Sequence, residues 1–157
     1  MSDEIIATLA PSQGRRWIAV AMLLVLGGLL LWLAFSTPAA ALLVQLFLLG
    51  LGLAALVMAE LIRRATETWI ELTEDGLRDG TGRELCRMDR IAAVERGAFA
   101  FKPSNGFLVR LTEPGERAWQ PGLWWRFGRR VGVGGVTPAG QGKFMADMIA
   151  LRLRERG

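Results

Sequence analysis

The stretch WIAVAMLLVLGGLLLWLAF, residues 17–35, decides the architecture of this chain because it contains no charged side chain in 19 residues. As an α-helix it would be about 28 Å long, close to the hydrocarbon thickness of a bilayer. A second apolar stretch, AAALLVQLFLLGLGLAALVMAELI, covers residues 39–62, and only residues 36–38 separate the two. So short a connection predicts an antiparallel hairpin of two membrane-spanning helices over residues 17–62.

A cleavable signal peptide is the alternative interpretation of the first apolar stretch, because the small residues of FSTPAAA, residues 35–41, follow it. Two features oppose cleavage. Asp3 and Glu4 lie in the segment that should be purely positive, and the apolar stretch is longer than a signal peptide requires. The second apolar stretch also follows immediately, which favours the hairpin.

Two arginine pairs predict the orientation of the hairpin. Arg15 and Arg16 precede the first stretch, Arg63 and Arg64 follow the second, and the turn between the stretches has no charge. Positive flanks stay in the cytoplasm. We therefore expect a two-pass protein of the bacterial inner (cytoplasmic) membrane with both termini in the cytoplasm. Residues 1–16 are then a cytoplasmic N-terminal segment, and residues 65–157 are a cytoplasmic domain.

Small residues recur at four-residue spacing on the second apolar stretch, as Gly50 with Ala54 and Ala55 with Ala59. Such spacing lets helix backbones approach closely. These residues are candidate helix-packing positions, either within the hairpin or against the helix of a partner, which includes a second copy of this chain. Gln45 is a candidate for a hydrogen bond between the two helices.

From residue 66 onward the apolar runs give way to short alternating segments separated by turn residues. Strand signals occur in the segments TWIELT, RELCRM, RIAAVERGAFAF and FLVRLT, in the third of which Phe99 and Phe101 share a face. Turns are expected at residues 74–76, 79–82, 102–106 and 113–116. Strands at roughly ten-residue intervals predict a small antiparallel barrel or sandwich.

The C-terminal segment changes to a helical period. Thr137 is the expected N-cap and Pro138 a first-turn residue. Phe144, Met148 and Leu151 then form an apolar stripe at helical spacing, flanked by Met145, Ile149 and Leu153. We expect this stripe to be the core face of a terminal helix that closes a mostly β domain.

The order of these elements, with WIELTEDGLRD at the start, MDRIAAVE in the middle and KFMADMIALRLRER at the end, resembles bacterial pleckstrin-homology-like (PH-like) domains. Such domains often follow short membrane hairpins. The resemblance implies a seven-stranded, partly open barrel capped by a helix, which scaffolds, binds or regulates at a membrane. Some proteins with such domains assist the assembly of photosynthetic complexes. The family has no shared catalytic residues.

Residues 119–135 combine tryptophan, arginine and glycine without an acidic residue, and four interpretations compete. A dinucleotide-binding loop is opposed by the incomplete GxGxxG pattern at Gly132, Gly134 and Gly135. Nucleic-acid binding is opposed by the nearly balanced charge of a domain tethered beside a bilayer. The third interpretation is a pair of core strands, LWWRF and RVGVGG. The fourth is a surface for lipid headgroups or a partner subunit.

Alternation along LWWRF places Trp124 and Arg126 on one face and Trp125 with Phe127 on the other, so one face can be core while the other binds. The candidate contact residues for a partner or lipid are Trp119, Trp124, Trp125, Arg126, Arg129 and Arg130.

The composition argues against an enzyme. The chain has no histidine, and its single cysteine, Cys86, fits a half-buried strand position better than a reactive thiol. We expect no catalytic, cofactor or metal site and no nucleic-acid partner. The predicted function is a non-catalytic scaffold, accessory or assembly subunit of a larger membrane protein complex. The alternative is a membrane-anchored sensor or regulator that binds anionic lipid or another anionic ligand.

Overall fold

A computed structural model describes residues 4–36, 38, 41–96 and 103–157, which form two compact units. Residues 13–64 make up one unit. The other combines residues up to 12 with the chain from residue 65 onward. Phe99 and Phe101, expected to share a strand face, lie outside the described residues.

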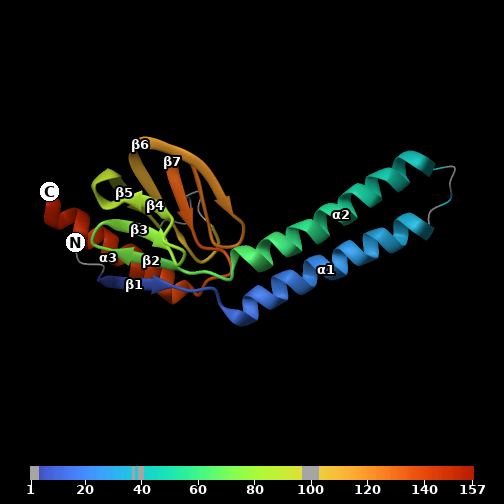
Figure 1. Cartoon of the computed structure of the whole chain (residues 1–157), viewed down its shortest axis with the longest axis horizontal. Coiled ribbons are helices and arrows are strands. Elements are labelled where there is room, and N and C mark those ends of the chain that lie inside the picture. Colours follow the sequence, from blue (N-terminus) through green and yellow to red (C-terminus); the bar gives the residue numbers. More distant parts are fainter. Residues whose placement is uncertain (1–3, 37, 39–40, 97–102) are drawn as a thin grey trace. The chain divides into compact units, whose positions relative to one another are not determined.

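The first unit is a helical hairpin of α1 (Gln13–Ser36) and α2 (Leu42–Ala65) (Figure 1). Each helix has 24 residues, is apolar enough to cross a membrane, and leaves most of its side chains exposed. The prediction of two long apolar helices is therefore confirmed.

Glycine and alanine bring α1 and α2 close together. A Cβ added to Gly27 would lie 2.7 Å from Leu56 Cδ2, so the helices touch there without room for a side chain. The Gln45 side chain donates a hydrogen bond to the Ala34 carbonyl at 3.2 Å, as expected for an amide between the helices. Of the two predicted small-residue pairs, one is buried in the hairpin and the other is exposed. The buried pair is Ala55 with Ala59, and the exposed pair is Gly50 with Ala54.

The second unit is an α+β fold of two antiparallel sheets and a C-terminal helix. The first sheet has the order β1-β2-β3-β4 and the second β5-β6-β7 (Figure 1). The strands are β1 (Ile5–Leu9), β2 (Ile70–Thr73), β3 (Gly76–Asp79), β4 (Glu84–Arg87), β5 (Ile91–Glu95), β6 (Phe107–Gln120) and β7 (Trp124–Val133).

Strand β1 was not identified in the sequence. It comes from the expected N-terminal segment and pairs antiparallel with β2, with Leu9 opposite Ile70. Both of these side chains are fully buried. The chain therefore enters the β unit first, leaves it to form α1 and α2, and returns as β2. The helical hairpin occupies the place of a loop between two neighbouring strands.

Two expectations about the second sheet were wrong. Residues 113–116 are not a turn, because β6 continues through Pro114 and Gly115 and absorbs them as irregularities in its pairing with β7. LWWRF and RVGVGG are not two strands paired with each other. They are two parts of the single strand β7, joined at Gly128, which has a φ of +57°.

The helix α3 (Ala139–Arg156) contacts β1 of the first sheet and β5 and β6 of the second, so it packs across both. Its N-cap position is Pro138 rather than Thr137. The expected core stripe was only partly right. Met148 packs against the core, but Phe144 and Leu151 are about half exposed, and the fully buried residues are Met145, Ala146 and Ile149. Two adjacent faces of α3 are apolar, one with Phe144 and Leu151 and the other with Met145 and Ile149. The face with Met145 and Ile149 is buried against the sheets, together with the small side chain of Ala146.

Replacement of Leu9 tests the role of β1. Because Leu9 is fully buried against β2, Leu9→Ala should lower the free energy of unfolding of the β unit by about 2–5 kcal/mol. Denaturant unfolding of the full chain in detergent micelles, followed by near-ultraviolet circular dichroism of its tryptophans, measures the change. Thr8→Ala is the matched control, since Thr8 is exposed on the same strand and should change stability by less than about 0.5 kcal/mol. Equal stability of the two variants would contradict this role.

Candidate functional site

The candidate site lies on a two-stranded ribbon at the end of the second sheet. Strand β5 pairs with β6 only at residues 108–111, whereas β6 and β7 continue to pair as far as Gln120 and Trp124. We call residues 112–120 of β6 together with residues 124–128 of β7 the ribbon. Its two faces have different environments.

The inner face of the ribbon belongs to the core. Ala118 and Trp124 are buried, as is Leu123 in the turn that joins the two strands, and the indole N–H of Trp124 donates to the Gln120 side-chain oxygen. The Arg83 guanidinium lies 5.4 Å from the centroid of the Trp124 ring. Trp124 is therefore a core residue whose polar atom is satisfied, and it cannot contact a partner from this position.

The outer face carries the remaining aromatic side chains. Trp119 lies directly opposite Trp125 in the strand register, and the rings of Trp125 and Phe127 are 5.5 Å apart at an interplanar angle of 37°. These three residues and Arg130 line a cleft of about 410 Å³, which we call the aromatic cleft. The predicted separation of Trp124 from Trp125 and Phe127 is confirmed.

Gly128 explains why Arg130 joins this cleft. Trp124 and Val131 both point into the core although they are seven residues apart, which simple alternation does not allow. The positive φ of Gly128 changes the phase of the strand, so the face of Trp125 continues through Arg130 to Gly132. A Cβ on Gly132 would lie only 2.3 Å from the Trp125 ring, so this glycine leaves the space in which Trp125 lies flat on the strand.

The aromatic cleft is exposed and positively charged. Trp119 is 53% exposed and Phe127 is 43% exposed. The Arg117 guanidinium lies 5.4 Å from the centroid of Phe127, and Arg129 is exposed beside Arg130. No acidic side chain lines the cleft, and within the described part of the chain none of these three arginines is paired with a carboxylate.

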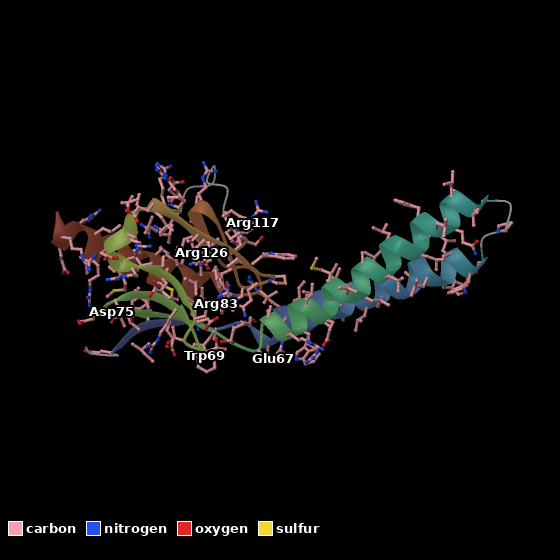
Figure 2. All side chains as sticks on the ribbon, turned by 45° about the horizontal axis from the view of Figure 1, so that its top comes forward. Glu67, Trp69, Asp75, Arg83, Arg117 and Arg126 are labelled. Atoms are coloured by element: carbon pink, nitrogen blue, oxygen red, sulfur yellow. The ribbon has the colours of Figure 1, made fainter. Side chains whose placement is uncertain are left out.

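Arg126 has a different role from its neighbours. Its guanidinium donates to the Leu85 carbonyl at 2.6 Å through Nη1 and to the Glu116 carbonyl at 2.6 Å through Nε. Leu85 is on β4, the last strand of the first sheet, and Arg126 is on β7, the last strand of the second. No strand pairing joins these two edges among the described residues. The Arg126 side chain therefore links β7 of the second sheet to β4 of the first. Figure 2 labels Arg126 within the α+β unit.

The six candidate contact residues thus separate into two groups. Trp119, Trp125 and Arg130 line the aromatic cleft, whereas Arg129 is exposed but is not among the lining residues. Trp124 and Arg126 are bound within the fold. Sequence analysis did not select Phe127 or Arg117 as contacts, although alternation already placed Phe127 beside Trp125, and Arg117 stands two residues before Trp119 on the same strand.

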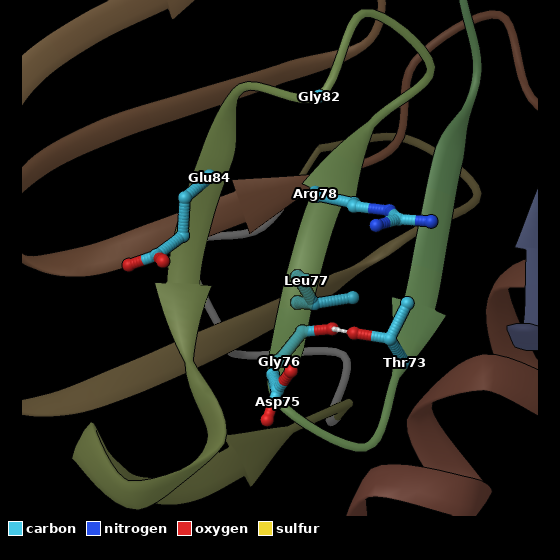
Figure 3. Close-up of a pocket in the computed structure, with 7 residues that line it drawn as sticks. All are labelled: Thr73, Asp75, Gly76, Leu77, Arg78, Gly82 and Glu84. Atoms are coloured by element: carbon cyan, nitrogen blue, oxygen red, sulfur yellow. Dashed lines mark hydrogen bonds between the residues drawn. The ribbon is translucent and has the colours of Figure 1, made fainter. Parts of the chain in front are cut away.

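A second hollow, of about 190 Å³, lies on the first sheet (Figure 3). Two of its polar side chains, those of Thr73 and Arg78, are bound to their neighbours. The Thr73 hydroxyl donates to the Gly76 carbonyl at 3.1 Å, and Arg78 forms an ion pair with Glu71 at 2.9 Å. Figure 3 shows Arg78 and Glu84 pointing away from each other, so these groups do not converge on a common ligand position.

The described residues contain no group of three or more histidine, cysteine or acidic side chains that could hold a metal ion. Cys86 lies on strand β4, as expected, but it is buried rather than half-buried, with 5% of its surface exposed. Burial raises the pKa of this thiol to about 12, so at neutral pH it stays protonated and is a poor nucleophile. Cys86 is therefore a residue of the core and not a reactive thiol.

Comparison of the chain with protein-family models, with curated proteins and with solved structures finds no match. Two long apolar helices followed by antiparallel sheets and a C-terminal helix describe the architecture, and no family is assigned. The aromatic cleft and the helical hairpin are the two features that support a functional proposal.

Replacement of Arg126 tests its role as the link between the sheets. Arg126→Gln removes the charged donors to Leu85 and Glu116, and we expect the free energy of unfolding to fall by about 1–3 kcal/mol. Arg129→Gln makes the same charge change at an exposed position and should alter stability by less than about 0.5 kcal/mol. If both variants unfold at the same denaturant concentration, Arg126 does not hold the sheets together.

The burial of Cys86 predicts its reactivity. At about pH 8 an ordinary thiol reacts readily with maleimide, whereas Cys86 in the folded chain should react at least about tenfold more slowly and label fully in denaturant. Because the pKa of Cys86 is higher in the folded chain than in the unfolded chain, its contribution to the free energy of unfolding is fully present below the ordinary thiol pKa. That contribution is lost as the pH rises toward the folded pKa of about 12. Mass spectrometry after timed labelling measures the rate. Rapid labelling of the folded chain would contradict the buried position.

Proposed function

We propose that this chain is a non-catalytic scaffold, accessory or assembly subunit of a larger membrane protein complex. In this proposal α1 and α2 anchor it in the bacterial inner membrane, and the α+β unit serves as a PH-like interaction module in the cytoplasm. The observation that carries the proposal is the aromatic cleft, an exposed binding surface on a unit from which two membrane-length helices extend.

The helical hairpin supports the membrane anchor. Its two helices have the length and apolar surface of membrane spans, and all four of its arginines lie at one end, where the chain enters and leaves. Arg16 donates to the Arg63 carbonyl at 3.0 Å, and Glu60 forms ion pairs with both Arg63 and Arg64. Positive charge gathered at one end favours a cytoplasmic position for that end.

The exposed face of α2 supports a partner within the membrane. Ala55 and Ala59 are used in packing against α1, whereas Gly50 and Ala54 face outward, and a Cβ on Gly50 would meet nothing within 4 Å. A second small-residue face on the same helix allows another helix to approach closely. That helix belongs to a partner subunit or to a second copy of this chain.

The α+β unit supports a binding role rather than a catalytic one. Its element order agrees with the PH-like resemblance, in which strands precede a closing helix. Its cleft presents tryptophan and arginine, the residues that contribute most to protein interfaces, and no nucleophile paired with a base. The absence of histidine from the chain removes the most common general base.

A second candidate function is a membrane-anchored sensor or regulator that binds an anionic ligand. Two arginines at the aromatic cleft, Arg117 and Arg130, favour it, because they form a local positive field to which exposed Arg129 adds. In this case the cleft would respond to a ligand instead of holding a permanent partner.

Affinity purification tests the proposed function. The tagged full chain, extracted from native membranes in a mild detergent, should carry at least one other membrane protein in fixed stoichiometry, identified by mass spectrometry. Gly50→Leu with Ala54→Leu should remove that protein by filling the exposed face of α2, if the contact lies in the membrane. Leu43→Ala, at an exposed apolar position elsewhere on α2, is the control and should retain it.

Two results would oppose the proposal. Recovery of the chain alone would exclude a stable accessory subunit and favour the sensor. A partner that is retained by every hairpin and cleft variant would show that neither surface makes the contact.

A further inference from the structure

We propose that the aromatic cleft docks on the anionic lipid headgroups of the same membrane that holds α1 and α2. This inference rests on the proposed function for the placement of the hairpin in a membrane. It goes further in assigning the cleft to a lipid surface, so that the contact fixes how the α+β unit lies on the bilayer.

The aromatic side chains have the chemistry of the bilayer interface. Tryptophan combines a large apolar ring with an N–H donor, and it is enriched at the level of the headgroups. Trp119 and Trp125 face each other across the ribbon, with Phe127 beside them, so three rings form one continuous apolar surface. More than half of the Trp119 surface is exposed to solvent.

The arginines around the cleft complement lipid phosphate. Arg117 lies over Phe127 and Arg130 lines the cleft, while Arg129, which precedes Arg130 in the chain, is exposed. Guanidinium groups bind phosphate oxygens through paired N–H donors. Near an anionic surface each such cation contributes about 1 kcal/mol, which is about fivefold in the docking constant.

The short connections between the α+β unit and the hairpin allow even a weak contact between the cleft and lipid to be populated. Three residues separate β1 from α1, and four separate α2 from β2, so each link can extend by no more than about 14–18 Å. The first link is itself held in the α+β unit, because the Ser12 N–H donates to the Val136 carbonyl at 2.8 Å. Two short links keep the unit near the bilayer at a high effective concentration, and a docking contact too weak for a free domain then becomes populated.

A fluorescent label on the ribbon tests the docking. The full chain with Glu116→Cys, carrying an environment-sensitive dye, is placed in nanodiscs of phosphatidylcholine alone or with about one third phosphatidylglycerol. Glu116 is exposed beside Arg117, and native Cys86 is too buried to take the dye. In anionic discs we expect a blue-shifted emission and about twofold greater quenching by headgroup-nitroxide lipid, both weakened by about 0.5 M salt.

Matched variants separate the cleft from general surface charge. Arg117→Gln with Arg130→Gln should lower the docking constant by about 25-fold, from two arginines at about fivefold each. Arg154→Gln with Arg156→Gln makes the same charge change at exposed positions on α3 and should have a much smaller effect. Trp119→Ala removes an exposed ring with little risk to folding. Gly132→Ala keeps every charge and ring but displaces Trp125, and it should also weaken docking.

A label at Glu155→Cys on α3 reports on a different element, and its signal should not follow the cleft variants. The inference is overturned if the signal at position 116 is the same in both lipid compositions, or if the two arginine pairs affect it equally. Should cleft variants instead remove a stoichiometric protein partner while the label ignores lipid, the cleft binds protein and the proposed function stands without lipid docking. Lipid docking without any co-purified partner would keep this inference and reject the accessory subunit.

Discussion

The pairing of β1 with β2 is the constraint on which the rest of the structure depends. These strands are neighbours in one sheet, yet the whole helical hairpin lies between them in the sequence. A membrane segment inserted between paired strands must return to the side from which it left, so it needs an even number of spans. The hairpin has two helices of span length, and its four arginines lie where the chain enters and leaves it. Sheet pairing and charge placement are therefore both consistent with the proposed two-pass insertion.

Strands β4 and β7, the last strands of the two sheets, are connected by the side chain of Arg126 and not by strand pairing. The two sheets share a core under α3 but are not joined by strand pairing between β4 and β7. Arg126 spans this edge by binding carbonyls of both β4 and β6. The residues on either side of Arg126 in this strand, Trp125 and Phe127, point to the opposite face. One short segment thereby supplies both the link between the sheets and the rings of the aromatic cleft, which explains why its tryptophans and arginines lie so close together in the sequence.

Local patterns predicted the elements that local physics determines, and missed those set by distant contacts. Continuous apolar runs identified both long helices, and alternation assigned Trp124 and Trp125 to opposite faces. Strand β1 was missed because its partner lies about sixty residues away, beyond the helical hairpin. Pro114 and Gly115 carry turn signals, but pairing with β7 holds them in a strand. On α3 both adjacent faces are apolar, so only the sheets decide which one is buried. The phase change at Gly128 needs a backbone angle that composition does not reveal.

The position of the aromatic cleft separates binding from folding. Its rings lie on the part of β6 and β7 that extends beyond β5, where the inner face, through Ala118 and Trp124, already supplies the core contacts. The outer face can therefore change its side chains without disturbing the core, apart from Gly132, whose missing side chain holds Trp125 in place. Exposed apolar surface of this kind is costly to keep in water unless something covers it. In the proposed membrane placement, the two short links keep the α+β unit within reach of lipid headgroups, which could then cover the cleft without a separate encounter.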